Sequence, residues 1–336
     1  MAAATIRDVA RRADVSVATV SRVINDSPLV SDGTRQKVLD VIADLDYIPN
    51  PNAQRLSLGR TLTIGVILPF LTLPSFVERL RGVQSALEDS GYDLILYSVE
   101  SPPKIESYLK KLSRRDHIGG AIIISLPLDD AYVERFETAK IPAILLDAVH
   151  PRMNHVIVDD VAGGYKATRH LIDLGHRRIA FLSDYLENPF GFVSMRHRYQ
   201  GYRQALAEAG LPFVPTYHRE GELGGREAFQ EAKDLLSLQD APTAVFAASD
   251  THAIGVLKAA HELGIRVPEQ LSVIGYDGIR DAEYLDLTTV QQPLFDSGVE
   301  SANILLASLV EPPESPLEVI LPTELVVRGT TAPPLG

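Results

Sequence analysis

The chain contains no cysteine, which excludes disulfide bonds and thiolate metal or redox chemistry. Its longest apolar stretches, such as TLTIGVILPFLTL at 61–73, are interrupted by Gly and Pro. They fall short of the roughly 20 apolar residues that a membrane-spanning helix needs. The first residues, MAAATIRDVARRADV, lack the apolar run of a secretory signal. We therefore expect a cytoplasmic protein without a membrane segment.

Motifs of the common α/β enzymes are also missing. No GxGxxG follows the first strand-like segment, and GxxxxGK[ST], GxSxG and HExxH do not occur. The SYLK of Ser107–Lys110 matches SxxK but has no partner motifs. The nine histidines are scattered along the chain. We predict no enzymatic activity, no cofactor and no metal site.

Charge is distributed unevenly. The whole chain has a formal net charge of −12. Residues 1–60 hold eight Lys and Arg against seven Asp, a net charge of +1, so the remainder carries −13. The length of 336 residues allows two or three domains, and 45% hydrophobic residues can bury sizeable cores. A weakly basic head, residues 1–60, therefore precedes an acidic body, residues 61–336.

Three short helices are predicted in the head. Thr5 and Asp8 can form a capping box for a helix from about Ile6 to Arg12. Ser16 can cap a second helix that runs to about Asn25. A third begins at Ser31 or Asp32 and would bury Val38, Val41, Ile42 and Leu45. Because a tight turn joins the first two, the pattern indicates a helix-turn-helix unit.

The second helix, within DVSVATVSRVIN, carries small residues where a solvated helix would show Lys–Glu pairs. In a helix-turn-helix unit this helix enters the major groove, where the hydroxyls of Ser16, Thr19 and Ser21 can bond phosphates. Val17 and Ala18 can meet thymine methyl groups, and Arg22 can read guanine or hold a phosphate. The alternative is a generic three-helix bundle whose second helix carries small residues on its outer face by chance.

The segment TIRDVARRADVSVATVSRVIN, followed by YIPNPNAQRLSLGRTLTIGVILP, resembles the amino-terminal signature of the LacI/GalR (lac and galactose repressor) family. The resemblance implies that Val17, Ala18 and Arg22 read bases. It also implies a set of contacts to the sugar–phosphate backbone, made by Thr5, Ser16, Thr19, Ser21, Asn25, Ser31 and Thr34. The partner expected from this resemblance is operator DNA.

The resemblance further implies a hinge helix in residues 48–60, which forms on operator DNA. Leu56 occupies the place of the leucine that wedges into the minor groove, with Ala53 and Gln54 beside it. The hinge departs from the family's usual ARSLRTG at Gln54, Arg55, Ser57 and Leu58. This shift of basic residues leaves the hinge's phosphate contacts open.

The body alternates apolar strand-like runs, such as GGAIIISLP, IPAILLDA and TAVFAASD, with helical stretches. This pattern predicts an α/β fold of two doubly wound parallel sheets. The resemblance implies a periplasmic-binding-protein-like core with crossings near residues 161, 292 and 322. The expected domains are 1–47, the hinge 48–60, an N-subdomain of 61–161 and 293–322, and a C-subdomain of 162–292 and 323–336.

Ligands of open α/β sheets lie beyond the carboxyl ends of strands. These ends and the helices that follow them supply seven candidates for effector binding: Phe70, Leu71, Phe76, Asp147, Ser249, Asp277 and Gln292. The resemblance adds Arg198, which aligns with the family arginine that grips the effector, and Ser194 one turn before it. We expect Asp250, which precedes a helix, to be an N-cap instead of a ligand contact.

The effector class stays open at this point. The family's sugar binders often have PDISNPFF where this chain has PFLTLPSF, so the mouth of the site is unusually apolar. A sugar, a glycoside, a nucleoside or a less polar compound would fit, and an arginine between carboxylates also suits a carboxylate or phosphate.

We expect a ligand-responsive transcriptional regulator, most simply a repressor, that binds a pseudopalindromic operator as a homodimer. The end TTAPPLG lacks the leucine-heptad tail of the family's tetramers, which favours a dimer. A solute-binding transport receptor is the other class considered. It would need a secretory signal and would not need the head.

Overall fold

The computed structural model describes residues 4–25, 27–47, 61–222 and 224–335. The chain folds as two compact units, Met1–Thr63 and Ile64–Gly336. The whole of the expected hinge, residues 48–60 with Ala53, Gln54 and Leu56, lies outside the described residues. None of the helices in the described part is long and apolar enough to cross a membrane.

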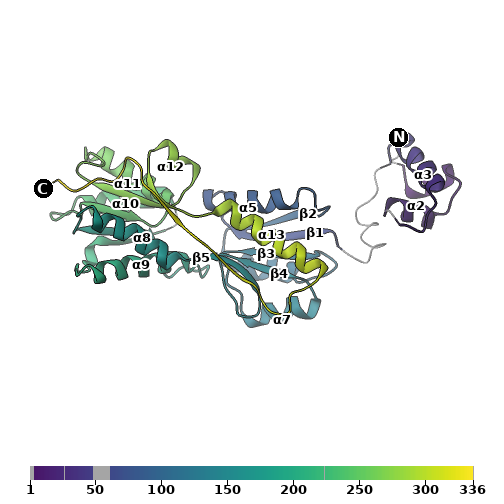
Figure 1. The fold of residues 1–336 in the computed structure, drawn as a ribbon, viewed down its shortest axis with the longest axis horizontal. Coiled ribbons are helices and arrows are strands. Elements are labelled where there is room, and N and C mark those ends of the chain that lie inside the picture. Colours follow the sequence, from purple (N-terminus) through teal and green to yellow (C-terminus); the bar gives the residue numbers. More distant parts are fainter. Residues whose placement is uncertain (1–3, 26, 48–60, 223, 336) are drawn as a thin grey trace. The chain divides into compact units, whose positions relative to one another are not determined.

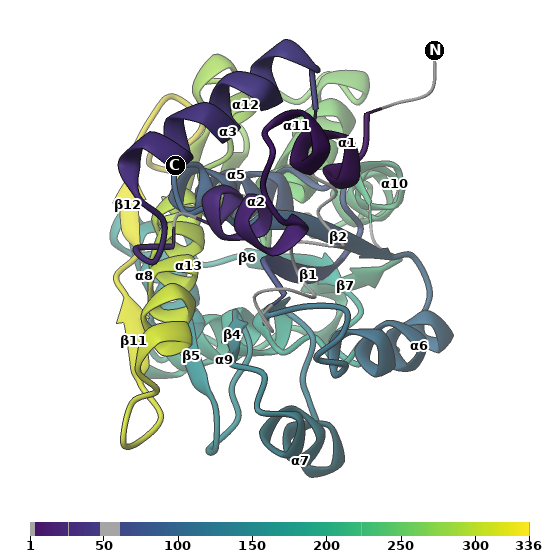
Figure 2. The ribbon, with the colours of Figure 1, turned by 90° about the vertical axis from the view of Figure 1, so that its right-hand side faces the viewer.

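The first unit consists of α1 (Ile6–Arg12), α2 (Val17–Ile24) and α3 (Asp32–Asp44), drawn in purple in Figure 2. The predicted capping box at Thr5 is present, and Ser16 caps α2 by accepting from the Thr19 amide at 3.0 Å. Asp14, in the turn between α1 and α2, has a φ of 50°, which aspartate tolerates better than most residues. The three helices enclose a core of Val9, Ala10, Ala13, Val20, Val23 and Val38. The helix-turn-helix prediction is therefore confirmed.

The first sheet of the second unit has the order β11-β5-β4-β3-β1-β2. Its strands are β1 (Thr63–Pro69), β2 (Asp93–Val99), β3 (Gly120–Ile124), β4 (Ala143–Leu146), β5 (Asn154–Val158) and β11 (Glu318–Leu321). β3 pairs in parallel with β1 and β4, and β5 with β4 and β11. The helices of this part are α5 (Pro74–Leu87), α6 (Pro102–Leu112), α7 (Asp130–Ala139) and α13 (Leu294–Val310). The strands of β1 and β3 are buried throughout, as expected for a sheet covered on both faces.

The second sheet has the order β12-β10-β9-β8-β6-β7. Its strands are β6 (Ile179–Asp184), β7 (His218–Gly221), β8 (Ala244–Ala247), β9 (Ser272–Asp277), β10 (Thr288–Gln291) and β12 (Glu324–Val326). β6 pairs in parallel with β7 and β8, and β9 with β8 and β10, whereas β12 pairs antiparallel with β10. Its helices are α8 (Asp160–Asp173), α9 (Ser194–Glu208), α10 (Gly225–Leu236), α11 (Asp250–Glu262) and the short α12 (Arg280–Tyr284), with a 3₁₀ turn at Pro215–Tyr217.

The chain passes between the two sheets more than once. It leaves the first sheet after β5, returns after β10 to form α13, and passes again between β11 and β12 (Figure 1). Residues from both sheets can therefore meet where these connections lie side by side. The predicted α/β architecture of two doubly wound, mainly parallel sheets is confirmed.

Two helix pairs, α8 with α9 and α5 with α13, pack backbone against backbone. A Cβ atom added to Gly164 of α8 would lie 2.2 Å from the carbonyl oxygen of Arg198, and one added to Gly201 would lie 2.1 Å from that of Val161. A Cβ atom at Gly298 of α13 would likewise lie 2.0 Å from the carbonyl oxygen of Arg79. These glycines therefore set how closely α9 approaches α8 and how closely α5 approaches α13.

We predict that Gly201→Ala lowers the melting temperature of the second unit by about 3–10 °C, because a methyl group against rigid backbone overpacks a close contact. Circular dichroism during a thermal scan measures this shift. Gly33→Ala is the control, since nothing lies within 4 Å of its added Cβ atom and alanine favours helix. An unchanged melting temperature for Gly201→Ala would contradict the close packing of α8 and α9.

Candidate nucleic-acid interface and ligand pocket

Helix α2 has one buried and one accessible side. Val20 and Val23 are buried in the core of the head. Val17 leaves 42% of its surface exposed, and Ala18 and Arg22 are exposed as well. The three residues expected to read bases are therefore accessible in the free protein.

The side chains expected to contact the DNA backbone are held in place by near neighbours. Hydrogen bonds join Ser16 to Thr19 at 2.9 Å, Ser31 to Thr34 at 3.0 Å, Asn25 to Ser21 at 3.4 Å, and Thr5 to Asp8 at 2.6 Å. A hydroxyl with one such bond keeps further hydrogen-bonding capacity. Because its rotamer is already restricted, it loses less conformational entropy when it binds a phosphate.

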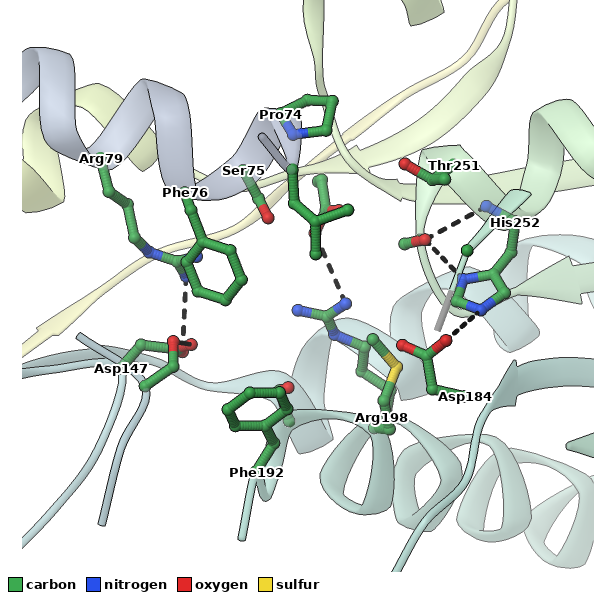
Figure 3. Close-up of a pocket in the computed structure, with 17 residues that line it drawn as sticks. Pro74, Ser75, Phe76, Arg79, Asp147, Asp184, Phe192, Arg198, Thr251 and His252 are labelled. Atoms are coloured by element: carbon green, nitrogen blue, oxygen red, sulfur yellow. Dashed lines mark hydrogen bonds and ion pairs between the residues drawn. The ribbon is translucent and has the colours of Figure 1, made fainter. Parts of the chain in front are cut away.

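The second unit contains a cavity that opens to solvent (Figure 3). Side chains from both sheets and their helices line it. Six of the predicted effector residues are among them: Phe76, Asp147, Ser194, Arg198, Ser249 and Asp277. The sequence did not single out the other lining residues: Leu73, Pro74, Ser75, Arg79, Ser125, Asp184, Phe192, Met195, Gly224, Thr251 and His252.

Three predicted effector residues do not line the cavity. Phe70 turns toward Phe190, with 4.8 Å between ring centroids. Leu71 packs, partly buried, against the core of the first sheet. Gln292 is buried behind the lining residues. It accepts a hydrogen bond from Arg79 and donates one to Asp277, and both of these residues line the cavity.

Arg198 of α9 is buried, with 3% of the residue exposed, and it lies at the centre of Figure 3. Its Nε donates to Asp160 at 2.9 Å, and its Nη1 donates to the carbonyl oxygen of Ala248 at 2.6 Å and lies 3.4 Å from Asp277. The guanidinium carbon is 3.8 Å from the ring centroid of Tyr276, a cation–π contact. Burial opposes the charged form, but the two carboxylates raise the pKa of Arg198. The arginine is thus fully charged and held from three sides.

Arg79 of α5 belongs to a second buried pair. Its Nη2 lies 3.4 Å from Asp147, which also accepts from the Ser125 hydroxyl at 2.6 Å. The same Nη2 donates to Gln292 Oε1 at 3.1 Å, and Gln292 Nε2 donates to Asp277 at 2.6 Å. Burial raises the pKa of Asp277, against the opposing effect of Arg198 and Arg79. A continuous polar network therefore joins groups on the two sheets.

Strained backbone occurs at the strand ends beside the cavity. Ser125, Asp147 and Asp277 follow or end β3, β4 and β9 with φ values of 56°, 62° and 113°. Phe70, after β1, has a φ of 45°. Non-glycine residues rarely adopt this region, and strain of about 1–3 kcal/mol per residue concentrates at functional sites. The strain supports the assignment of this cavity as a binding site.

A third polar group lies on the other side of Arg198 from Asp147. The Oγ atom of Ser249 is 2.5 Å from Nδ1 of His252, and Nε2 of His252 is 2.9 Å from Oδ1 of Asp184. All three residues are more than nine-tenths buried. Figure 3 shows the His252 ring directed toward Asp184, with a dashed line for their contact.

The expectation that Asp250 caps α11 is wrong, because the N-cap is its neighbour Ser249. Asp250 instead has another structural position. Its two oxygens accept from the Thr289 hydroxyl at 2.6 Å and the Ile279 amide at 2.9 Å. Burial and the nearby charge of Asp277 raise the pKa of Asp250 to about 7. It ties the turn after β9 to β10 and does not line the cavity.

The sequence held usable signals for some of the lining residues that it did not single out. Asp184 ends an apolar strand, as Asp147 and Asp277 do. Arg79 follows Phe76 by three residues on α5, and His252 follows Ser249 by three, so each pair shares a helix face. Phe192 lies in the loop before α9, where no periodicity predicts its direction.

Comparison with known proteins identifies the family of both units. Residues 5–50 match the model of "Bacterial regulatory proteins, lacI family", and residues 168–331 match that of the periplasmic binding protein-like domain. The HTH-type transcriptional regulator DegA of Bacillus subtilis (strain 168) is 34% identical over 98% of this chain and 98% of its own.

Two solved structures are also similar. The lac repressor dimer bound to operator and the anti-inducer ONPF is 32% identical, with a TM-score of 0.86 over 98% of this chain and 100% of its own. A complex of the transcriptional regulator CelR with cellobiose is 31% identical, with a TM-score of 0.72 over 97% and 99%. With a head that matches the family model and a relative of this identity over almost its whole length, the chain belongs to the lacI family of bacterial regulatory proteins and is a DNA-binding transcriptional regulator.

Proposed function

We propose that the chain represses transcription by binding a pseudopalindromic operator as a dimer, and that a small effector in the cavity controls this binding. The observation that carries the proposal is the polar network from Asp147 through Arg79 and Gln292 to Asp277 and Arg198. Since its members belong to both sheets, a ligand that bonds Asp147 and Arg198 together favours one relative arrangement of the two subdomains.

In this proposal α2 lies in the major groove of each half-site. Val17, Ala18 and Arg22 contact base edges, and the paired hydroxyls of the head contact phosphates. Leu56, with Ala53 and Gln54, acts in the hinge at the minor groove. The lac repressor dimer, which has been solved on its operator, supports both the dimer and the mode of binding.

The effector is a small molecule such as a sugar or a glycoside, held by residues from both subdomains. We assign the N-subdomain to residues 61–161 and 293–322 and the C-subdomain to 162–292 and 323–336. The cellobiose in the CelR complex supports a sugar-like effector. Effector binding changes the angle between the subdomains and with it the pairing of the two hinges on DNA. By linkage, an effector that weakens operator binding itself binds less well to the operator complex.

Selection from random duplex DNA tests the proposal. The full chain should enrich a palindrome of two half-sites, and a panel of sugars, glycosides and nucleosides should contain a compound that changes its affinity at least tenfold, ~1.4 kcal/mol of coupling. Arg22→Ala should weaken the selected site more than random DNA, because it removes a base contact. If no palindrome emerges with or without the panel, the proposal is wrong.

Arg198→Ala should separate effector response from DNA binding. Its operator affinity without effector should stay within about twofold of wild type, while the tenfold effector response disappears, because only the pocket loses its central cation. Fluorescence anisotropy of labelled operator measures both. Arg169→Ala, at an exposed arginine of α8, is the matched control.

Because the substitution leaves Asp160 buried without its partner, Arg198→Ala should also lower the melting temperature. The binding assay is therefore run well below that temperature. A full effector response in Arg198→Ala would remove this arginine from the proposed site.

A further inference from the structure

The loop between β6 and α9, residues 185–193, reaches from one sheet to the other. It leaves β6 at Asp184 and enters α9 at Ser194, and both of these elements belong to the second sheet. Phe190 and Phe192 on this loop nevertheless pack against the apolar core of the first sheet. The proposed function assigns the loop no role.

The two phenylalanine rings of the loop meet other rings that belong to the first sheet. Phe190 and Phe192 stack on each other, with 5.4 Å between centroids and 14° between ring planes. Phe70, which follows β1, meets Phe190 edge-on at 4.8 Å and Phe192 edge-on at 6.4 Å. Phe76 of α5 lies 6.5 Å from Phe192. Stacked and edge-on pairs of this kind are favourable beyond the apolar area that they bury.

Asn188 fixes the conformation of the loop from which both rings project. Its Oδ1 accepts from the amides of Phe190 at 3.0 Å and Phe192 at 3.1 Å. Its Nδ2 donates to the carbonyl oxygen of Phe192 at 3.1 Å. Because one side chain holds the turn through three hydrogen bonds, the loop loses less conformational entropy when its rings dock.

The tip of the loop lies directly against the segment that follows β3 of the first sheet. Gly191 has a φ of 78°, a conformation that favours glycine. A Cβ atom added there would lie 2.9 Å from Cγ of Pro127. The absence of a side chain at this position therefore permits the close approach of the loop to the first sheet.

Both ends of the loop are attached to the second sheet. The amides of Tyr185 and Leu186 donate to β7, to the carbonyl oxygen of Gly221 at 3.0 Å and to the carboxylate of Glu220 at 2.8 Å. The other end continues into α9. The rings of the loop must therefore separate from Phe70 whenever the two sheets move apart.

We propose that residues 185–193 form a latch that holds the two subdomains together through the contacts of Phe190 and Phe192 with Phe70. Since only side chains of the chain itself take part, the latch favours the joined arrangement both with and without an effector. An effector that needs the separated arrangement has to overcome the latch, and one that fits the joined arrangement is assisted by it.

The latch is thus a device that sets the conformational equilibrium of the body before an effector acts on it. Its expected effect on DNA binding rests on the proposed function, because that function couples the arrangement of the subdomains to the hinges. The latch itself is a property of the body, and it is tested without DNA.

The test measures the distance between two spin labels on the full chain by double electron–electron resonance. Since the chain has no cysteine, Lys104→Cys on α6 and Arg226→Cys on α10 place one label at an exposed position of each subdomain. An excess of unlabelled chain removes distances between copies. We expect one narrow distance distribution when the loop is otherwise unchanged.

Phe190→Ala should increase the population outside that distribution by about threefold or more, because it removes the ring that contacts Phe70 most closely. Phe190 lies outside the described lining of the cavity, so the effector site keeps its side chains. Tyr185→Ala is the matched control on the same loop, since Tyr185 is 48% exposed, and it should leave the distribution unchanged. An unchanged distribution in Phe190→Ala would overturn the latch.

Asn188 is tested as a positioning residue by rescue. Asn188→Asp keeps an oxygen that accepts from both amides and should retain the narrow distribution, whereas Asn188→Ala should broaden it as Phe190→Ala does. This pair also serves if Phe190→Ala does not fold, as judged by circular dichroism. A lower melting temperature in Asn188→Ala without any change of distance would show a purely structural role and overturn this assignment.

The effect on DNA binding is measured with the operator selected as described above, by fluorescence anisotropy and without any added compound. Phe190→Ala should change the operator affinity by about threefold or more, and Tyr185→Ala should not. A changed distance with an unchanged operator affinity would leave the latch standing and contradict the proposed coupling of the subdomains to the hinges. An unchanged distance with a palindrome still selected would overturn the latch and leave the proposed function intact.

Discussion

Arg198 is buried and keeps a full positive charge, and the cavity depends on the groups that stabilise this charge. Taking a guanidinium group out of water costs several kcal/mol, about as much as well-placed carboxylates return. Asp160 and Asp277 supply that return, and the Tyr276 ring covers the remaining face. Arg79 is also buried and charged, and Asp147 is its ion-pair partner. Charged walls of the cavity are therefore held by ion pairs and by the hydrogen bonds that link them.

Apolar runs predicted β1 to β4, β6, β8 and β9, and they missed the inner strands β5 and β10 as well as three short edge strands. β7 (HREG) and β11 (EVIL) are edge strands, and neither is fully buried, so neither carries a continuous apolar signal. β12 has only three residues and pairs antiparallel with β10. The alternation of strands and helices in the sequence does not predict such a strand. The helices of the head were found almost to the residue, because Thr5 and Ser16 mark their starts chemically.

The cavity was predictable to the extent that strand ends define it. The strand ends predicted Asp147, Ser249 and Asp277. The same reasoning, applied to the end of β6, would also have predicted Asp184. It included Phe70 because the backbone turn that carries the side chain to Phe190 is not written in the local sequence. Loop residues such as Phe192 depend on contacts distant along the chain, which no local pattern encodes.

The glycines at Gly164 and Gly298 have a mechanical consequence. Each places the carbonyl of a cavity arginine directly against the backbone of the neighbouring helix, so neither α9 nor α5 can slide without separating from its partner. Packed helices ordinarily accommodate motion by small shear displacements, and backbone contact of this kind removes that freedom. Each arginine is thus rigidly attached to its own half of the protein. If a ligand moves Arg79 relative to Arg198, we expect each arginine to move together with the helix pair that carries it.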